Sequence, residues 1–226
     1  QTFTYITNPS QGTTNDVEVS ATDSLGDSVS DSASATVDTI WPDIQVTESV
    51  SPEIIHSGDA VLWTVEVANL GDDPLVDVTL NDDNGHAYGD PFNLAVGASR
   101  TFTYTTNPEQ DVTNVVRASA TDSLGGSVSD SASAAVHVVQ AGLDIVETVT
   151  PETLYGGDTA LWRVVVTNES EDALTDVTLS DDVNGHDYGD PFDLAPGASR
   201  TFTYTTAPEA DVTNTVTASG LDPLGA

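Results

Sequence analysis

The chain has 226 residues, 38% of them apolar, and carries 37 acidic against four basic side chains, for a formal net charge of −33. Because phosphate contacts need lysine and arginine, this charge excludes nucleic-acid binding, and attraction to anionic membranes fails for the same reason. The chain also has no cysteine, which excludes disulfides and thiolate metal sites, and no apolar run that approaches the roughly 20 residues of a membrane-spanning helix.

One sequence pattern recurs along the chain with a period of about 100 residues, which is the length of one β-sandwich domain and not of a solenoid repeat. GASRTFTYTT occupies residues 97–106 and again 197–206, and TFTY stands near the start, at residues 2–5. We expect three parts: strands E to G of one repeat in 1–40, a complete repeat in 41–140, and in 141–226 a repeat that lacks its last strand.

The complete repeat is predicted to form seven short strands separated by turn residues. Alternation in the second strand places Val61, Trp63, Val65 and Val67 on one face, toward a core. By the same reasoning the inward aromatic side chains are Phe102, Tyr104, Trp162, Phe202 and Tyr204. The expected strands are 44–50, 60–68, 75–80, a short one within 82–92, 100–106, 112–120 and 127–138.

Almost no sequence separates the last strand of one repeat from the first strand of the next, which predicts a rod-like array. The third repeat has no counterpart of residues 127–138, so its sandwich is expected to be open at one sheet edge. Two completions remain open at this point. Either the polypeptide continues, or a neighbouring copy donates residues 26–39 by donor-strand complementation, and both join segments head to tail.

Three stretches carry a resemblance to a known family. They are residues 67–82, 95–104 and 112–125, and they recur at 166–181, 196–204 and 212–225. They resemble the "conserved repeat domain" of microbial surface proteins, the domain of unknown function numbered eleven, although Val96 stands where that family usually has proline. The resemblance implies tandem immunoglobulin-like, seven-stranded β-sandwiches in large proteins that are extracellular or anchored at the cell surface.

The motif D-x-N-G-H-x-Y-G-D occurs once in each of the two longer repeats. One interpretation is a hairpin, because Asn-Gly suits a type I′ turn. The alternative is a calcium site, because closely spaced Asp and Asn oxygens suit a hard cation. The predicted ligands are Asp82, Asn84, Asp90, Asp182, Asn184 and Asp190.

Two further features complete the functional expectations. Asn168 begins an N-x-S sequon, which is as consistent with chance as with glycosylation. No histidine shares a setting that suggests a catalytic triad, and each notable residue is duplicated, so we expect no enzyme.

The sequence favours a structural repeat of an extracellular microbial filament, stalk or sheath that associates with copies of itself. The alternative is the stalk of a calcium-dependent adhesin whose partners are surface glycans or host cells.

Overall fold

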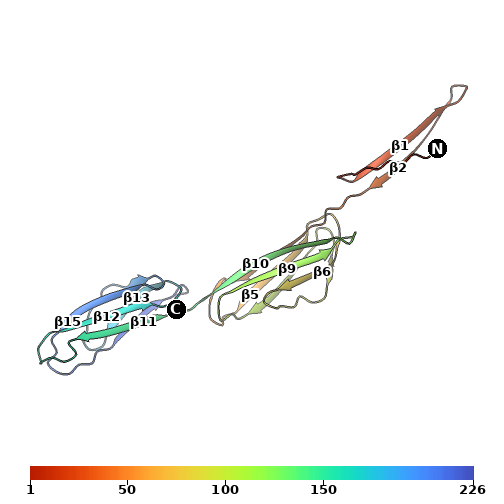
Figure 1. Cartoon of the computed structure of the whole chain (residues 1–226). Coiled ribbons are helices and arrows are strands. Elements are labelled where there is room, and N and C mark those ends of the chain that lie inside the picture. Colours follow the sequence, from red (N-terminus) through yellow and green to blue (C-terminus); the bar gives the residue numbers. More distant parts are fainter. The chain divides into compact units, whose positions relative to one another are not determined.

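The chain is all-β: a computed structural model describes residues 1–226 as sixteen strands without a helix (Figure 1). No helix is therefore present that has the length and apolarity to cross a membrane. Contacts divide the chain into two compact units, and the boundary crosses five strands of the middle repeat, each of which contributes to both units. The first unit comprises residues 1–48, 65–102 and 115–132, and the second 49–64, 103–114 and 133–226.

The N-terminal segment forms one antiparallel hairpin of β1 (Thr13–Thr22) and β2 (Ser28–Val37), in which Thr13 lies opposite Val37. Every side chain of both strands is exposed. Residues 2–5, which we expected to form a strand, lie in none. In the other repeats the same sequence lies in a strand, β8 (Ser99–Thr106) or β15 (Ser199–Thr206). These strands pair with β5 (Val61–Asn69) and β12 (Ala160–Asn168), and residues 1–40 contain no counterpart of either partner.

The middle repeat contains two sheets. One has the order β3 (Ile44–Ser51), β5 (Val61–Asn69), β8 (Ser99–Thr106). The other has the order β4 (Ile54–His56), β10 (Ser127–Val139), β9 (Val112–Thr121), β6 (Leu75–Asp82), β7 (Phe92–Leu94). All seven expected strands are present, but the short one begins at Phe92, the last residue of its expected range, and continues to Leu94. The additional strand, β4, pairs in parallel with the end of β10.

The predicted inward face of β5 is confirmed, because Val61, Trp63, Val65 and Val67 are all buried. Trp63 stacks on Tyr104 with ring centroids 6.1 Å apart. The indole nitrogen of Trp63 donates a hydrogen bond of 2.9 Å to the Thr106 hydroxyl, so the polar edge of this core residue is also satisfied.

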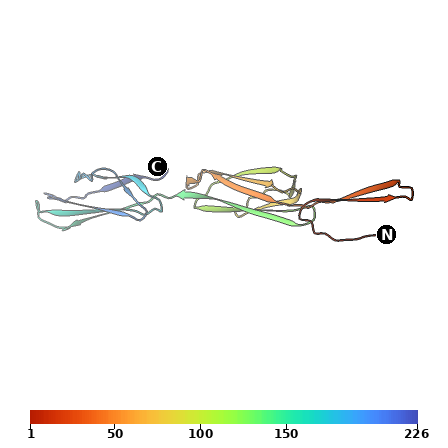
Figure 2. The same cartoon turned by 90° about the horizontal axis from the view of Figure 1, so that it is seen from above.

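The third repeat also contains two sheets, and its strands can be followed from above in Figure 2. One sheet has the order β11 (Leu143–Thr150), β12 (Ala160–Asn168), β15 (Ser199–Thr206), and the other β14 (Phe192–Leu194), β13 (Leu174–Asp181), β16 (Val216–Leu221). Val166 of the first sheet and Leu174, Val177 and Leu194 of the second form one core cluster, against which Phe202 packs. Residues of both sheets therefore share a core, as in a β-sandwich.

Candidate functional site

In the third repeat, the D-x-N-G-H-x-Y-G-D motif folds around the carboxylate of Asp181. Its Oδ2 accepts hydrogen bonds from Tyr204 Oη at 2.9 Å, Asn214 Nδ2 at 3.0 Å and Tyr188 Oη at 3.3 Å. Its Oδ1 accepts one from the backbone N–H of Gly185 at 2.8 Å. The loop is thus fastened to β13, β15 and the segment that leads into β16.

Asn214 links the loop backbone to the strands around it. Its Oδ1 accepts a hydrogen bond from the backbone N–H of Asn184 at 3.1 Å, and its Nδ2 donates to Glu147 Oε1 at 2.9 Å. His186 covers the cluster, since its ring stacks on Tyr204 with centroids 4.1 Å apart. Four strands or their flanking segments therefore meet at this cluster, which we call the tyrosine–aspartate network.

The protonation states in the network follow from burial and hydrogen bonding. Burial by itself would raise the pKa of Asp181, but the bonds from Asn214, Tyr204 and two backbone amides outweigh it, and the pKa lies below the usual value of 3.8. Burial raises the pKa of Tyr188 and raises that of Tyr204 to about 12. At neutral pH the carboxylate is therefore charged and both tyrosines are donors.

The middle repeat places Asp82 at the position of Asp181. Asp82 is buried, and its Oδ2 accepts a hydrogen bond of 2.8 Å from Tyr88 Oη. The backbone amides of Asp83 and Asp182 donate to equivalent carbonyls, those of Val115 and Thr215, at 3.2 Å each.

A correction to the sequence alignment follows from these contacts. Aligned at a spacing of 100 residues, Asp82 corresponds to Asp182. Its contacts, however, are those of Asp181, so the spacing before the loop is 99 residues. The one residue by which the third repeat is longer is therefore Val183, directly before Asn184. Sequence comparison missed Asp181 because an aspartate pair precedes the loop in both repeats, so that either residue can be aligned.

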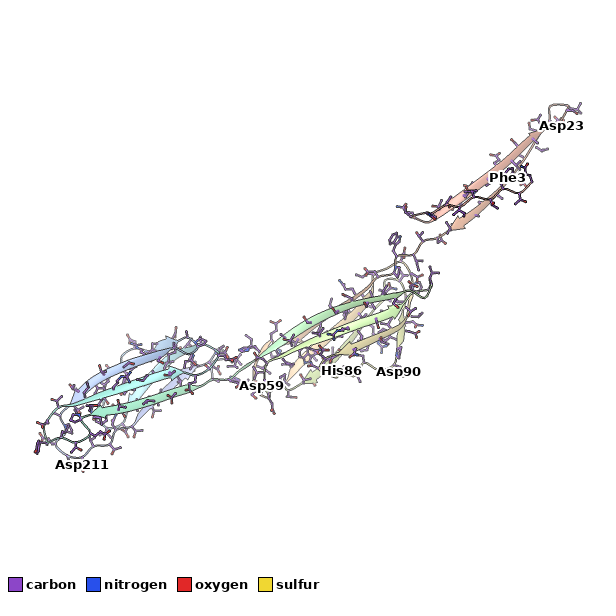
Figure 3. All side chains as sticks on the ribbon, in the orientation of Figure 1. Phe3, Asp23, Asp59, His86, Asp90 and Asp211 are labelled. Atoms are coloured by element: carbon purple, nitrogen blue, oxygen red, sulfur yellow. The ribbon has the colours of Figure 1, made fainter.

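The predicted calcium ligands lie in different environments. Asp82 is the counterpart of Asp181 in the middle repeat and accepts the hydrogen bond from Tyr88, whereas Asp182 Oδ1 accepts a 2.7 Å hydrogen bond from Thr215 N. Asn184 Nδ2 donates to Tyr204 Oη at 3.2 Å, whereas Asn84, Asp90 and Asp190 are exposed (His86 and Asp90 are labelled in Figure 3). No three acidic or histidine side chains are grouped so as to hold a metal ion, so calcium binding stays a prediction.

Recurring aspartates close the turn that follows β1, β9 and β16. Asp122 Oδ1 accepts hydrogen bonds from Leu124 N at 2.9 Å and Gly126 N at 2.7 Å. Asp222 makes the corresponding bonds to Leu224 N at 2.8 Å and Ala226 N at 3.2 Å. This is an Asx-type turn, so the third repeat forms the same turn that leads from β9 into β10.

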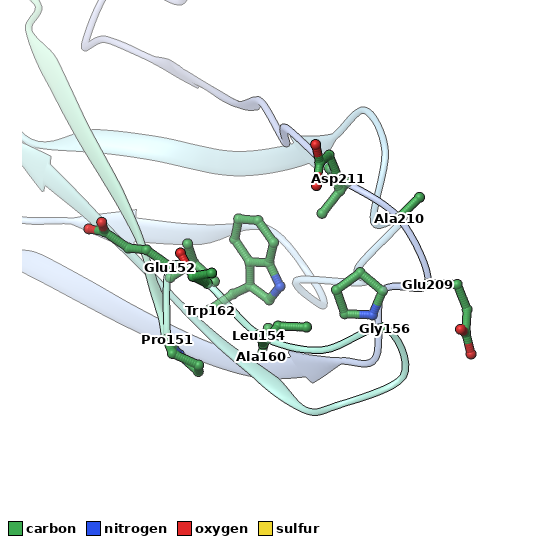
Figure 4. A pocket seen from close by; sticks show the side chains of 13 residues that line it. Pro151, Glu152, Leu154, Gly156, Ala160, Trp162, Glu209, Ala210 and Asp211 are labelled. Atoms are coloured by element: carbon green, nitrogen blue, oxygen red, sulfur yellow. The ribbon is translucent and has the colours of Figure 1, made fainter.

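The third repeat also contains an open cleft of about 400 Å³ at one end of its two sheets. Val149, Leu154, Trp162 and Val212 form its apolar part, and Figure 4 shows Trp162 at its centre with acidic side chains at the rim. In the middle repeat, the counterparts Val50, Ile55, Trp63 and Val112 pack together with Val136 and Val138 of β10. The cleft is therefore the place that β10 fills one repeat earlier.

Compared with protein-family models and with curated proteins, the chain gives no match.

Proposed function

We propose that this chain is a structural repeat region of an extracellular microbial filament, stalk or sheath, built from tandem immunoglobulin-like, seven-stranded sandwiches in a rod-like array. The observation that carries the proposal is duplication. The tyrosine–aspartate network, the Trp–Tyr stack and the turn aspartate all recur in the two longer repeats. A binding or catalytic protein is expected to concentrate its special residues in one place, whereas duplicated internal networks serve architecture.

The strand orders support the immunoglobulin-like assignment. Sheets of the type A-B-E and G-F-C are what that fold requires, and β3-β5-β8 and β10-β9-β6 have this order. The resemblance to the conserved repeat domain of microbial surface proteins points the same way.

The charge supports an extracellular and salt-rich setting. A net charge of −33 repels other copies at low ionic strength, and at molar salt the Debye length falls to about 3 Å. Head-to-tail association of copies is therefore expected in salt. We test the proposal by electron microscopy of the 226-residue chain in molar sodium chloride. Unbranched fibres are the expected result, and a chain that stays monomeric at millimolar concentration would contradict the filament.

The runner-up function is the stalk of a calcium-dependent cell-surface adhesin. The D-x-N-G-H-x-Y-G-D loops motivate it, because calcium bound there would stiffen a stalk. Under this alternative the chain does not form fibres, and the midpoint of its thermal unfolding rises with calcium more than with sodium at equal ionic strength.

A further inference from the structure

One histidine links the end of the middle repeat to a loop of the third. His137 lies near the end of β10, and its Nδ1 and Nε2 are 3.0 Å from Asp111 and 2.8 Å from Asp172. Asp111 precedes β9 of the middle repeat, whereas Asp172 precedes β13 of the third. All three residues belong to the second compact unit, and β9, β10 and β13 each have a strand on both sides.

The two contacts of His137 decide which protonation state of the ring fits. A neutral imidazole carries one N–H, so its second nitrogen would turn a lone pair toward a negative carboxylate. Only the imidazolium donates to both partners. The hydrogen bond with Asp172, and next the one with Asp111, accordingly raise the pKa of His137 above its ordinary value of 6.5.

The surroundings of His137 are uniformly acidic. The charged side chains that line the two surface grooves beside the ring are all carboxylates, namely Glu53, Asp111, Glu169, Glu171 and Asp172. Asp111 keeps its charge to low pH, because hydrogen bonds from the Val138 backbone and from His137 hold its pKa below 3.8. A protonated ring is therefore the one positive group among these negative ones.

The core of the third repeat presents Asp172 to the histidine. Nδ2 of the buried Asn168 donates to the Asp172 carbonyl at 2.8 Å, and Ser170 Oγ donates to the same carbonyl at 2.9 Å. The loop backbone is thus fixed from within its own repeat. The Asp172 side chain, which is 16% exposed, meets the ring from this fixed position.

The same aspartate has another partner in the middle repeat. Asp73 also accepts a 2.8 Å hydrogen bond from Asn69 at its carbonyl, but its carboxylate accepts bonds from Ser123 N at 2.7 Å and Ser123 Oγ at 2.8 Å. The counterpart of Ser123 in the third repeat is Pro223, which has neither an N–H nor a hydroxyl group. Asp172 is therefore left to bind a donor from outside its repeat.

The histidine is as specific to this junction as its partner. One repeat earlier, Asp38 stands in the place of His137, and a carboxylate cannot bridge two others. Only residues 140–142 separate β10 from β11, so the side-chain contact of His137 lies beside a very short linker.

Asp111 keeps its partners when the ring loses a proton. Both of its oxygens lie within 3.1 Å of His137 Nδ1, and Oδ1 also accepts a 2.7 Å hydrogen bond from Val138 N. The neutral ring therefore retains its proton on Nδ1 and turns the Nε2 lone pair toward Asp172. The contact with Asp172 is the one that opens.

We propose that His137 is a pH-dependent clamp on this junction: the protonated ring holds Asp111 and Asp172 together, and loss of a proton releases Asp172 and frees the linker. This inference does not rest on the proposed function, because it concerns a link within one chain. The clamp is complete below pH 6.5 and is lost as pH rises through the raised pKa of His137. It also fails in acid, once pH falls through the lowered pKa of Asp111.

A second histidine at the same end does not depend on its charge. His56 Nε2 lies 2.8 Å from Asp222 Oδ2, whereas Nδ1 is 3.9 Å from Asp59. A neutral ring with its proton on Nε2 satisfies this contact, so the contact persists as pH rises. Two contacts fix an orientation, and after release of Asp172 the His56 contact acts as a pivot.

The first test titrates the histidines of the 226-residue chain by proton NMR, with His137→Gln to assign the signal. His137 should titrate with a midpoint above 6.5, and Asp172→Asn should lower this midpoint. Glu171→Gln removes an equal charge one residue away and should lower it less. A midpoint at or below 6.5, or one that responds equally to both variants, would overturn the clamp.

The second test measures motion at the junction by distances between two spin labels, in a chain without native cysteines. Labels at Thr105→Cys and Thr201→Cys occupy exposed strand positions in the two repeats. The distance distribution should be narrow at about pH 6 and broader at about pH 9. His137→Gln should give the broad distribution at both pH values. His137→Arg, which stays charged, should give the narrow one at both.

The His56→Gln chain is the matched control and should keep the broadening with pH. Circular dichroism at both pH values should show unchanged β-structure, which separates release of the clamp from unfolding. A distribution that ignores pH in the unchanged chain, or broadening that persists in His137→Gln, would overturn the inference. Broadening that follows the His137 titration and is absent from both His137 variants establishes it, whether or not the chain forms fibres.

Discussion

Asn69 should stabilise the middle repeat by about 2–4 kcal/mol. The residue ends β5 and is completely buried. Its Nδ2 donates to the carbonyls of Asp73 at 2.8 Å and Leu94 at 3.2 Å, and its Oδ1 accepts from Gly71 N at 3.0 Å. A neutral hydrogen bond contributes about 1 kcal/mol net, and a buried partner left unsatisfied costs about 1–3 kcal/mol. Three bonds are lost, and one of them comes from the Gly71 amide, which also donates to the Asp43 carbonyl at 3.2 Å, so the loss falls in the stated range.

Urea unfolding followed by circular dichroism measures this loss for Asn69→Ala, and hydrogen exchange locates it in the middle repeat. Asn168→Ala should destabilise the third repeat by a similar amount, since its Nδ2 donates to the Asp172 and Leu194 carbonyls at 2.8 and 2.9 Å. Asn81→Ala, at an exposed strand position, is the control and should change stability by less than about 0.5 kcal/mol. Losses at Asn69 and Asn168 as small as the control's would refute the reasoning.

Three other properties should respond to simple perturbations. Arg100→Gln should lower the free energy of unfolding by about 0.5–2 kcal/mol in urea titrations, because the guanidinium lies 4.5 Å from the Phe92 ring and 4.7 Å from that of Phe102; an unchanged value would exclude a cation–π contribution. The lowered pKa of Asp181 stabilises the fold above the ordinary carboxyl pKa of 3.8, and this stabilisation is lost as pH falls through the lower folded value. Asp181→Asn should therefore flatten the fall of the melting temperature between about pH 5 and pH 2, and an unchanged slope would contradict this role. Molar sodium chloride should raise the melting temperature, because it screens the net charge of −33. If calcium raises the melting temperature no more than sodium does at equal ionic strength, there is no specific calcium site. The same conclusion follows if the Asp90→Asn chain responds to calcium as strongly as the unchanged chain.

Strands with one buried and one exposed face could be predicted from the sequence, because apolar and polar residues alternate along them with a period of two. The faces of β5 and β12 are examples, with Trp63 and Trp162 both buried. β4 could not be predicted, because three residues contain no periodicity and its only partner is the distant end of β10. Residues 2–5 show the converse, since a sequence that forms a strand twice elsewhere does not do so without its partner.

The candidate site was less predictable, because burial decides what a polar side chain does. Asn168 has the sequence of a glycosylation acceptor, yet it is completely buried and its Nδ2 already donates two hydrogen bonds. The folded protein therefore offers this nitrogen to no glycan. Asn69 occupies the same place without a sequon, and comparison of these two positions is the signal that could have identified the structural role.

The middle repeat contains the strand β10, whereas residues 141–226 contain no counterpart of it, so the two repeats show which contacts depend on this strand. Without a counterpart of that strand, the third repeat keeps its core cluster around Val166 and Leu174 and its network around Asp181. Only the end near Trp162 opens, where β16 is shorter and residues 153–155 form no strand. The core cluster and the network of the third repeat are therefore built from contacts among β11 to β16.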